Sequence, residues 1–426
     1  MNDRDDAASA FRHLLHQAVR GVTDLVERSH DQVAGHVVRA ARAVGVGKQA
    51  EAFDAVRRLL TQASLVGVRS VNAAVEVAGD VAQDALRQPG QRGPVIGCAP
   101  LRSDAVQTAA GAVDAAVGAL CGAIGDRAGV AGSALDLGFG LRWGDAGGLG
   151  DAMLPDDDDA LRAMLAEQLQ APAREIGVYV HGLCATEWGF CFGAAANWGD
   201  PSTTFARLLH ESDGLLPLYA RYNSGRPIGQ NGAALAAWLE RLDAALDALG
   251  HPDRRYWLIG HSMGGLVARA ALADGLAREA AFCERVVAVA TLGTPHAGAP
   301  LERLVASLTQ ALSPIALPAA SIPKTLLEMR SAGIRDLAAG EPAWTSPAAT
   351  RWLLLAATLA ESDAGAVLGD GMVTRASALA EAAALPEAMA ARTTRATVAG
   401  VAHAAISNHP AVHARLAAFV REVREA

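Results

Sequence analysis

The chain has few cysteines, and its basic residues are not in excess. The five cysteines are odd in number and show no metal-ligand spacing, so the sequence predicts no disulfide framework, no metal and no cofactor, and it favours a reducing cytoplasm. A formal net charge of −8 without a basic stripe disfavours nucleic acid as a partner. The cysteines are Cys98, Cys121, Cys184, Cys191 and Cys283.

Long apolar runs are also scarce. Residues 1–6, MNDRDD, lack the basic start and unbroken apolar segment of a secretory signal, and charged or polar residues interrupt each stretch of about 18 residues that might span a bilayer. We therefore expect a cytoplasmic protein. With 51% hydrophobic residues among 426, the chain is long enough for one large α/β domain and an additional module.

Residues 1–150 show helical spacing of apolar residues and little strand pattern. Their helices contain few aromatic side chains and would form only a thin core alone, so we expect a cap or bundle packed on the rest of the chain. A membrane-surface helix is the alternative, but the polar faces lack the Lys and Arg that membranes select. After a glycine-rich link, Pro155 and the carboxylates of residues 156–159 predict a capped helix start, with a metal site as the less favoured interpretation.

From about residue 175, predicted strands alternate with predicted helices, such as Ala233–Leu249 and Leu266–Ala280. This alternation predicts an α/β fold with a mainly parallel sheet, helices on both faces, and ligands at the carboxyl ends of the strands. The predicted strands are Ile176–Val180, Leu218–Tyr222, Tyr256–Ile259, Val286–Thr291, Trp352–Ala357 and Thr397–Val401.

The pentapeptide GHSMG at Gly260–Gly264 lies between a predicted strand and a predicted helix. A G-x-S-x-G pattern arises easily by chance among 43 glycines, but the flanking strand and helix make this one typical of the nucleophile elbow of an α/β-hydrolase. Ser262 is therefore the predicted nucleophile. We expect the side chain of His261 to point away from the serine hydroxyl and to pack or hydrogen-bond behind the turn.

A serine nucleophile needs a base and an orienting acid, which follow it in the chain order Ser, Asp or Glu, His. Asp370, flanked by two glycines after a predicted strand, is the predicted acid, with Glu361 and Asp363 as weaker candidates and an ordinary turn as the alternative. His403 follows the last predicted strand and is the predicted base. His409 and His413 are its rivals, although His409-Pro410 indicates the start of a helix.

The tetrahedral intermediate needs two N–H donors. We expect them from Met263, the residue after the nucleophile, and Leu183, in the loop after the first recognisable strand. His181 is expected to brace that loop. Cys184 is a disfavoured rival nucleophile, because nothing near it in the sequence resembles an activated cysteine site.

With these residues in place, the chain from about 175 to 420 resembles bacterial α/β-hydrolases related to GPI inositol-deacylase, a branch of the lipase and esterase superfamily. The resemblance implies a serine esterase or lipase with Ser262, Asp370 and His403 as its triad, and it does not imply deacylation of a GPI anchor. The likeness is carried by VYVHGL (Val178–Leu183), RYNSGRPIGQNG (Arg221–Gly232), LIGHSMGGLVAR (Leu258–Arg269), LGTPHAGAP (Leu292–Pro300) and RSAGIRDL (Arg330–Leu337).

These patterns predict a catalytic domain over residues 151–426, with a lid-like insertion at about 299–350 that shapes an apolar acyl pocket. Trp188 and Phe190 are candidate substrate-binding residues, although core packing is nearly as good an explanation. The expected substrate is a small-molecule or lipid ester, and peripheral membrane contact is not indicated. The alternative is a catalytically silent fold that binds a protein or membrane partner.

Overall fold

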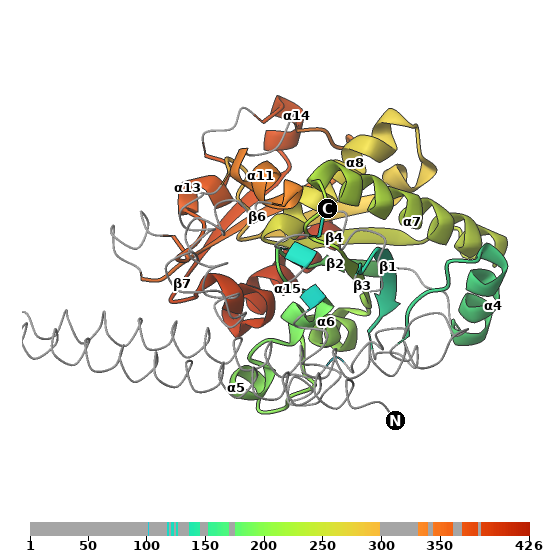
Figure 1. Cartoon of the computed structure of the whole chain (residues 1–426), viewed down its shortest axis with the longest axis horizontal. Coiled ribbons are helices and arrows are strands. Elements are labelled where there is room, and N and C mark those ends of the chain that lie inside the picture. The colour runs from blue at the N-terminus through green and yellow to red at the C-terminus, as the bar shows by residue number, and fades with distance from the viewer. Residues whose placement is uncertain are drawn as a thin grey trace, which may run out of the picture. The chain divides into compact units, whose positions relative to one another are not determined.

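Seven strands of the computed structural model form one sheet in the order β1-β3-β2-β4-β5-β6-β7 (Figure 1). β1 runs antiparallel to β3, and all other neighbouring pairs are parallel. The strands are β1 (Phe139–Trp143), β2 (Glu175–Val180), β3 (Leu216–Tyr222), β4 (Arg255–His261), β5 (Val286–Leu292), β6 (Arg351–Thr358) and β7 (Thr393–Ala399). The predicted α/β-hydrolase fold class is confirmed, and each of the six predicted strands overlaps an observed one.

The structure describes residues 101, 117–118, 121–122, 125–126, 136–144, 152–169, 175–298, 331–339, 344–360, 369–381 and 385–426. All of them fall in one compact unit made of Cys98–Ala105, Val117–Leu304 and Met329–Ala426. The residues before 100 of the predicted helical region 1–150, and residues 299–330 of the predicted lid-like insertion at about 299–350, lie outside the described residues. The cap or bundle and the lid therefore stay predictions.

Helices cover both faces of the sheet. In Figure 1, α7 and α8 lie together on one face, and α6 and α15 lie on the other. The α-helices are α4 (Asp158–Gln168), α5 (Ala194–Trp198), α6 (Phe205–Asp213), α7 (Ile228–Ala248), α8 (Met263–Ala277), α11 (Ala332–Ala339), α13 (Arg375–Ala378), α14 (Glu387–Ala390) and α15 (Pro410–Glu425). The short 3-10 helices of the described ranges are η2 (Glu187–Cys191), η3 (Ala281–Arg285) and η4 (His403–Asn408).

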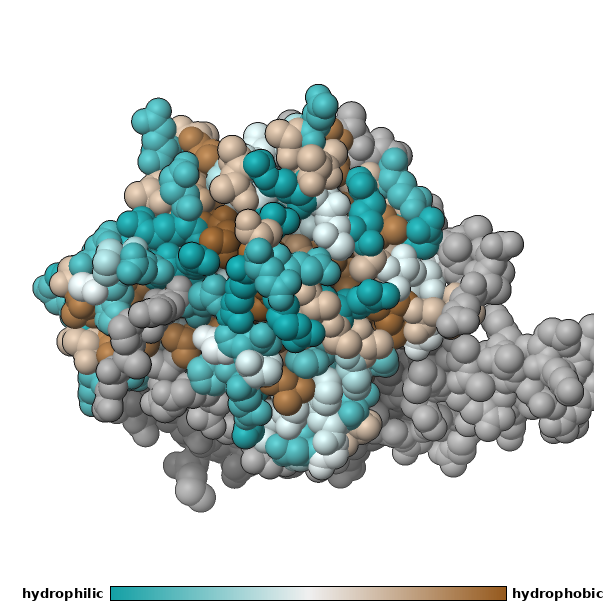
Figure 2. Space-filling view, turned by 180° about the vertical axis from the view of Figure 1, so that it is seen from behind, coloured by the Kyte–Doolittle hydropathy of each residue, from teal (hydrophilic) through white to brown (hydrophobic). Residues whose placement is uncertain are grey.

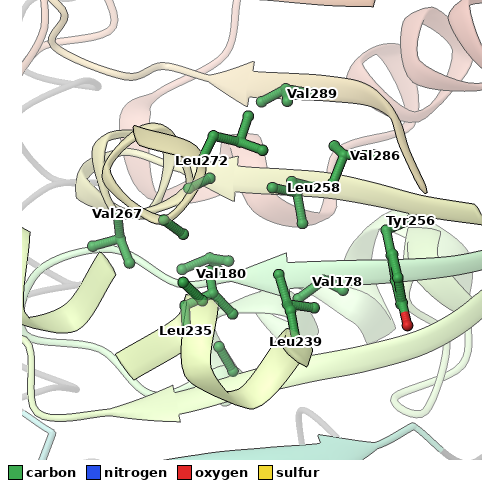
Figure 3. Close-up of a cluster of buried hydrophobic side chains, with 14 of the residues drawn as sticks. Val178, Val180, Leu235, Leu239, Tyr256, Leu258, Val267, Leu272, Val286 and Val289 are labelled. Carbon is green, nitrogen blue, oxygen red and sulfur yellow. The ribbon is translucent and has the colours of Figure 1, made fainter. Parts of the chain in front are cut away.

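The main core lies between the sheet and the pair α7 and α8, where Val180, Leu239 and Leu272 are fully buried (Figure 3). Parallel strands covered on both faces consist of nearly continuous apolar residues, and β2, β4 and β5 follow that pattern. Each fully buried Val or Leu contributes about 1.5–3 kcal/mol relative to an exposed one. This packing gives a rigid support for the loops at the carboxyl ends of the strands.

β1 corrects the sequence prediction, because it is a strand within the stretch of residues 1–150 that was expected to be helical. Its Leu141 and Trp143 are buried, and Arg142 is buried between them. The guanidinium of Arg142 donates to Glu187 over 2.7 Å, and Arg221 donates to the same carboxylate over 2.9 Å. The strand is therefore stabilised by a charge partner 45 residues away, which no local pattern reveals.

The acidic run before α4 is a helix cap, as the favoured interpretation predicted. Asp157 is the N-cap residue and accepts a hydrogen bond from the N–H of Ala160 over 2.9 Å, and two aspartates follow in the first turn.

On the face shown in Figure 2, hydrophilic and hydrophobic residues are interspersed. Within the ranges that the structure describes, no helix is long and apolar enough to cross a membrane.

Candidate active site

Ser262 lies at the sharp turn between β4 and α8, with φ 54° and ψ −126°. A non-glycine residue with positive φ is strained, at a cost of about 1–3 kcal/mol, and persists only where the surroundings enforce it. They do so here through glycine: a Cβ on Gly264 would lie 2.5 Å from the carbonyl oxygen of His181, and one on Gly265 would lie 2.9 Å from Thr294 Cγ2. The glycines let strand and helix approach closely enough to form the turn.

The side chains of Ser262, His403 and Asp370 form a hydrogen-bonded chain. His403 Nε2 lies 2.9 Å from Ser262 Oγ, and His403 Nδ1 lies 2.7 Å from Asp370 Oδ2. The three residues come from the loops after β4, β7 and β6, which the parallel sheet brings to one edge. Ser262 is only 6% exposed.

The carboxylate of Asp370 is fixed by its own loop. Its Oδ1 accepts hydrogen bonds from the N–H groups of Met372 and Val373, at 3.0 and 2.8 Å. The flanking Gly369 and Gly371 have φ of +64° and +98°, so they supply the left-handed turn that aims the carboxylate at His403. Glu361 and Asp363, the weaker candidates for the acid, lie outside the described residues.

The local charges set the protonation of the pair. Burial alone raises the pKa of Asp370, but His403 and the two N–H donors outweigh it and hold that pKa below its usual value. Since an ionised carboxylate only accepts hydrogen bonds, the proton lies on Nδ1 of His403 and Nε2 is left as the acceptor for the serine hydroxyl. The geometry thus suits removal of a proton from Ser262.

His261 hydrogen-bonds behind the turn, in the position that its place in the elbow suggests. Its Nε2 donates to the main-chain carbonyl of His403 over 3.0 Å. Burial lowers the pKa of His261 to about 3, so this imidazole is neutral at ordinary pH.

Gly293 lies beside the Asp370–His403 pair and has φ +61°. A Cβ at this position would lie 3.2 Å from Asp370 Oδ2, so only glycine fits there without crowding the pair.

The two expected oxyanion donors come from different segments: Leu183 lies in the loop after β2, and Met263 is the first residue of α8. In the described part of the chain, neither backbone N–H has a hydrogen-bond acceptor. A Cβ on Gly182 would lie 3.0 Å from Ser262 Cβ, which places the loop after β2 directly against the serine. Leu183 and Met263 therefore stay the proposed donors to a developing oxyanion.

His181 braces the loop after β2. Its Nδ1 donates to the carbonyl of Gly182 over 2.9 Å, and its own carbonyl accepts from the hydroxyl of Tyr222 over 2.6 Å. The imidazole stacks on the Tyr222 ring with centroids 4.1 Å apart. Burial lowers the pKa of His181 to about 4, which keeps the ring neutral.

Asn408 fastens the segment that carries His403, and no sequence pattern pointed to it. Its Oδ1 accepts from Trp198 Nε1 over 3.1 Å and from the N–H of Phe205 over 3.0 Å. Its Nδ2 donates to the carbonyl of Thr203 over 3.1 Å. These partners are more than 200 residues away in the sequence, so only the folded structure reveals these hydrogen bonds.

Phe190 is a correction among the candidate substrate-binding residues. Only 1% of its surface is exposed, and its ring packs against Tyr179, Phe205 and Tyr219 at centroid distances of 5.6–6.1 Å. Phe190 is a core residue, because these three aromatic rings surround its side chain. Trp188 is also largely buried, with 9% exposure.

The rival site residues have other partners. His409 caps α15 by accepting from the N–H of Ala411 over 3.2 Å, and His413 packs edge-on against Trp198. Burial raises the pKa of the Cys184 thiol to about 12, so this cysteine is no thiolate nucleophile at neutral pH. Over the residues that the structure describes, His, Cys, Asp and Glu form no cluster of three able to hold a metal ion.

Residues 238–316 match the family model described as PGAP1-like alpha/beta domain. This segment contains the nucleophile elbow and confirms the predicted resemblance to α/β-hydrolases. The sequence matches no curated protein.

Several solved structures are similar to part of this chain. The mature lipase BlEst2 of Bacillus licheniformis is 20% identical, with a TM-score of 0.36, over 59% of this chain and 93% of its own. A hyperthermophilic esterase from the archaeon Pyrobaculum calidifontis is 16% identical, with a TM-score of 0.36, over 61% and 80%. Naproxen esterase from Bacillus subtilis is 14% identical, with a TM-score of 0.33, over 58% and 84%.

Proposed function

We propose that this α/β-hydrolase domain cleaves carboxylic esters through an acyl-enzyme intermediate, with Ser262 as nucleophile, His403 as general base and Asp370 as the orienting acid. The observation that carries the proposal is the hydrogen-bonded chain from Ser262 Oγ through the imidazole of His403 to Asp370 Oδ2. A fold that only bound a partner would have no physical need to combine these hydrogen bonds with a strained serine and two N–H groups suited to an oxyanion.

The first half of the reaction forms the acyl-enzyme. Ser262 Oγ attacks the carbonyl carbon of the ester while its proton passes to His403 Nε2. The carbonyl oxygen becomes an oxyanion, which the N–H groups of Leu183 and Met263 stabilise. When the tetrahedral intermediate collapses, the bond to the alcohol oxygen breaks, and His403 returns its proton to that oxygen.

The second half repeats the same steps with water. His403 Nε2 takes a proton from a water molecule, whose oxygen attacks the acyl carbon. The bond to Ser262 Oγ then breaks, the proton on His403 passes to the serine oxygen, and the carboxylic acid leaves. Asp370 stays ionised throughout and stabilises the imidazolium that forms in each half.

The substrate proposed for this site is a small-molecule or lipid ester. Trp188 remains a proposed lining residue because it lies in η2, close in sequence to the loop that carries Leu183. No cofactor takes part in the proposed mechanism, since the nucleophile, base and oxyanion donors all come from the chain itself.

A fluorophosphonate probe tests the proposal, because it labels only a serine that is activated for attack. Labelling of the wild-type protein, its loss in Ser262→Ala, and hydrolysis of p-nitrophenyl esters of graded acyl length are the expected results. If correctly folded wild-type protein is neither labelled nor active on any ester, the proposal is wrong and a catalytically silent fold becomes the favoured interpretation.

A further inference from the structure

The oxyanion loop, residues 182–186, is held by segments that lie far from it in the sequence. On one side, the hydroxyl of Ser224 accepts a hydrogen bond from the N–H of Cys184 over 3.0 Å. Cys184 itself has a positive φ of 57°, so its backbone is strained and depends on its neighbours. This residue directly follows Leu183, the proposed oxyanion donor.

On another side, the loop contacts glycines among the described residues 117–118, 121–122 and 125–126, which we call the brace segment. A Cβ on Gly122 would lie 2.6 Å from the backbone nitrogen of Cys184 and 2.7 Å from its Cα. A Cβ on Gly118 would lie 2.9 Å from Thr186 Cγ2 and 3.1 Å from the carbonyl carbon of Ala185. The two backbones therefore touch where only glycine fits.

The brace segment has anchors of its own, which do not involve the oxyanion loop. The hydroxyl of Ser331 donates to the carbonyl of Gly122 over 2.7 Å, and Asn223 Nδ2 donates to the carbonyl of Gly125 over 3.0 Å. Asp126 Oδ2 accepts from the N–H of Ala332 over 2.8 Å. The described residues of the brace segment are therefore held at Gly122, Gly125 and Asp126.

We infer that Gly122 is a positioning residue for the oxyanion hole: without a side chain, it lets the brace segment pack against Cys184, and the contact through Cys184 keeps the N–H of Leu183 directed at the place that the oxyanion will occupy. This inference rests on the proposed function. Oxyanion donors contribute only when they are held in place before the charge develops, and a displacement of about 1 Å can cost on the order of a hundredfold in rate. The brace segment lies within the stretch of residues 1–150 that the sequence separated from the catalytic domain.

Gly122→Ala is the direct test, because its methyl group would force Cys184 to move. We expect kcat for a p-nitrophenyl ester to fall by about ten- to a hundredfold with KM little changed. A boronic acid that adds to Ser262 Oγ forms a tetrahedral adduct with an oxygen in the oxyanion hole. Its inhibition constant should rise by a similar factor, while the pH profile of kcat/KM keeps its shape because the Ser262–His403–Asp370 chain is intact.

Gly275→Ala is the matched control. A Cβ on Gly275 would lie 2.7 Å from the sulfur of Cys283 and 2.7 Å from Phe282 Cζ, a comparable overlap at the far end of α8. This variant should lower the melting temperature and leave kcat and boronic-acid inhibition unchanged. Comparing the two variants separates loss of stability from loss of oxyanion binding.

Ser331→Ala is the second variant, which decides the matter if Gly122→Ala does not fold. It removes the hydrogen bond to the Gly122 carbonyl and adds no atom near the loop, so we expect a several-fold fall in kcat and a matching rise in the boronic-acid constant. Wild-type kcat and inhibition in the folded variants would overturn the inference alone. Absence of Ser262-dependent hydrolysis in the wild type would overturn the proposed function, and the inference with it.

Discussion

The imidazole of His261, the residue before the nucleophile, donates a hydrogen bond to the main-chain carbonyl of His403 over 3.0 Å. The N–H of His403 in turn donates to the carbonyl of Asp370 over 3.0 Å. The ring nitrogens of His403 hydrogen-bond to Asp370 and Ser262, so four atoms of His403 take part in hydrogen bonds. Such over-determination keeps a ring in one orientation, which proton transfer requires.

Replacing His261 should therefore slow the reaction without changing binding. In His261→Phe the ring volume remains but the donor is lost, and we expect kcat to fall about tenfold with KM little changed. His261→Gln, whose amide nitrogen can reach the same carbonyl, should recover part of the rate. His210→Phe, on α6, is the control and should keep wild-type kcat; equal rates for all three variants would show that the hydrogen bond to His403 is not needed.

Ser262→Ala should abolish ester hydrolysis and leave the fold intact. The elbow geometry is enforced by the neighbouring glycines rather than by the hydroxyl, so removing Oγ costs the nucleophile alone. Loss of a triad nucleophile lowers kcat by on the order of a thousandfold or more. Steady-state kinetics and circular dichroism on the same preparation check both halves, and near-wild-type turnover in pure mutant protein would refute the assignment.

Asp370→Asn should lower activity and change the pH dependence of stability. Because the pKa of Asp370 in the folded protein lies below its ordinary value of about 3.9, the charged form contributes stability above that value. This contribution is lost as pH falls through the folded pKa. In urea unfolding, the stability gap between wild type and Asp370→Asn should narrow as the pH falls below about 4.

The kinetic effect of Asp370→Asn should be large, since an amide favours the wrong tautomer of the base. In Ser-His-Asp enzymes this change costs about 10⁴ in kcat. A variant with almost full activity, or a stability gap that widens in acid, would contradict the role assigned to this carboxylate.

Phe190→Ala should reduce stability and leave substrate preference unchanged. Its ring is buried among Tyr179, Phe205 and Tyr219, and emptying such a site costs about 3–5 kcal/mol. The ratio of rates on short and long p-nitrophenyl esters, measured well below the melting temperature, should match the wild type. Trp188→Ala is the comparison: a changed ratio there would support its proposed place in the acyl site, and a changed ratio for Phe190→Ala would return that residue to the site.

The sequence by itself determined the features that depend on neighbouring residues. The apolar runs located β2, β3, β4, β5 and β6, because strands buried on both faces leave a local pattern. β7 is largely exposed or half-buried, and the predicted strand overlapped only its last residues, Thr397–Ala399. Glycines marked both turns: those around Ser262 allow the strand and the helix to pack closely, and Gly369 and Gly371 beside Asp370 supply positive φ. The chain order Ser, Asp, His then followed from the order of the loops, and these three side chains are hydrogen-bonded in the structure.

Only the tertiary structure decided the contacts between distant segments. The charged Arg142 interrupts the apolar pattern of β1, and its partner Glu187 lies 45 residues away in the sequence. Phe190 belongs to the core because Tyr179, Phe205 and Tyr219 meet around it, and Asn408 supports the segment of His403 through residues more than 200 positions away. Gly122 meets Cys184 for the same reason: close packing joins surfaces that the sequence keeps apart, and no local pattern encodes which surfaces will touch.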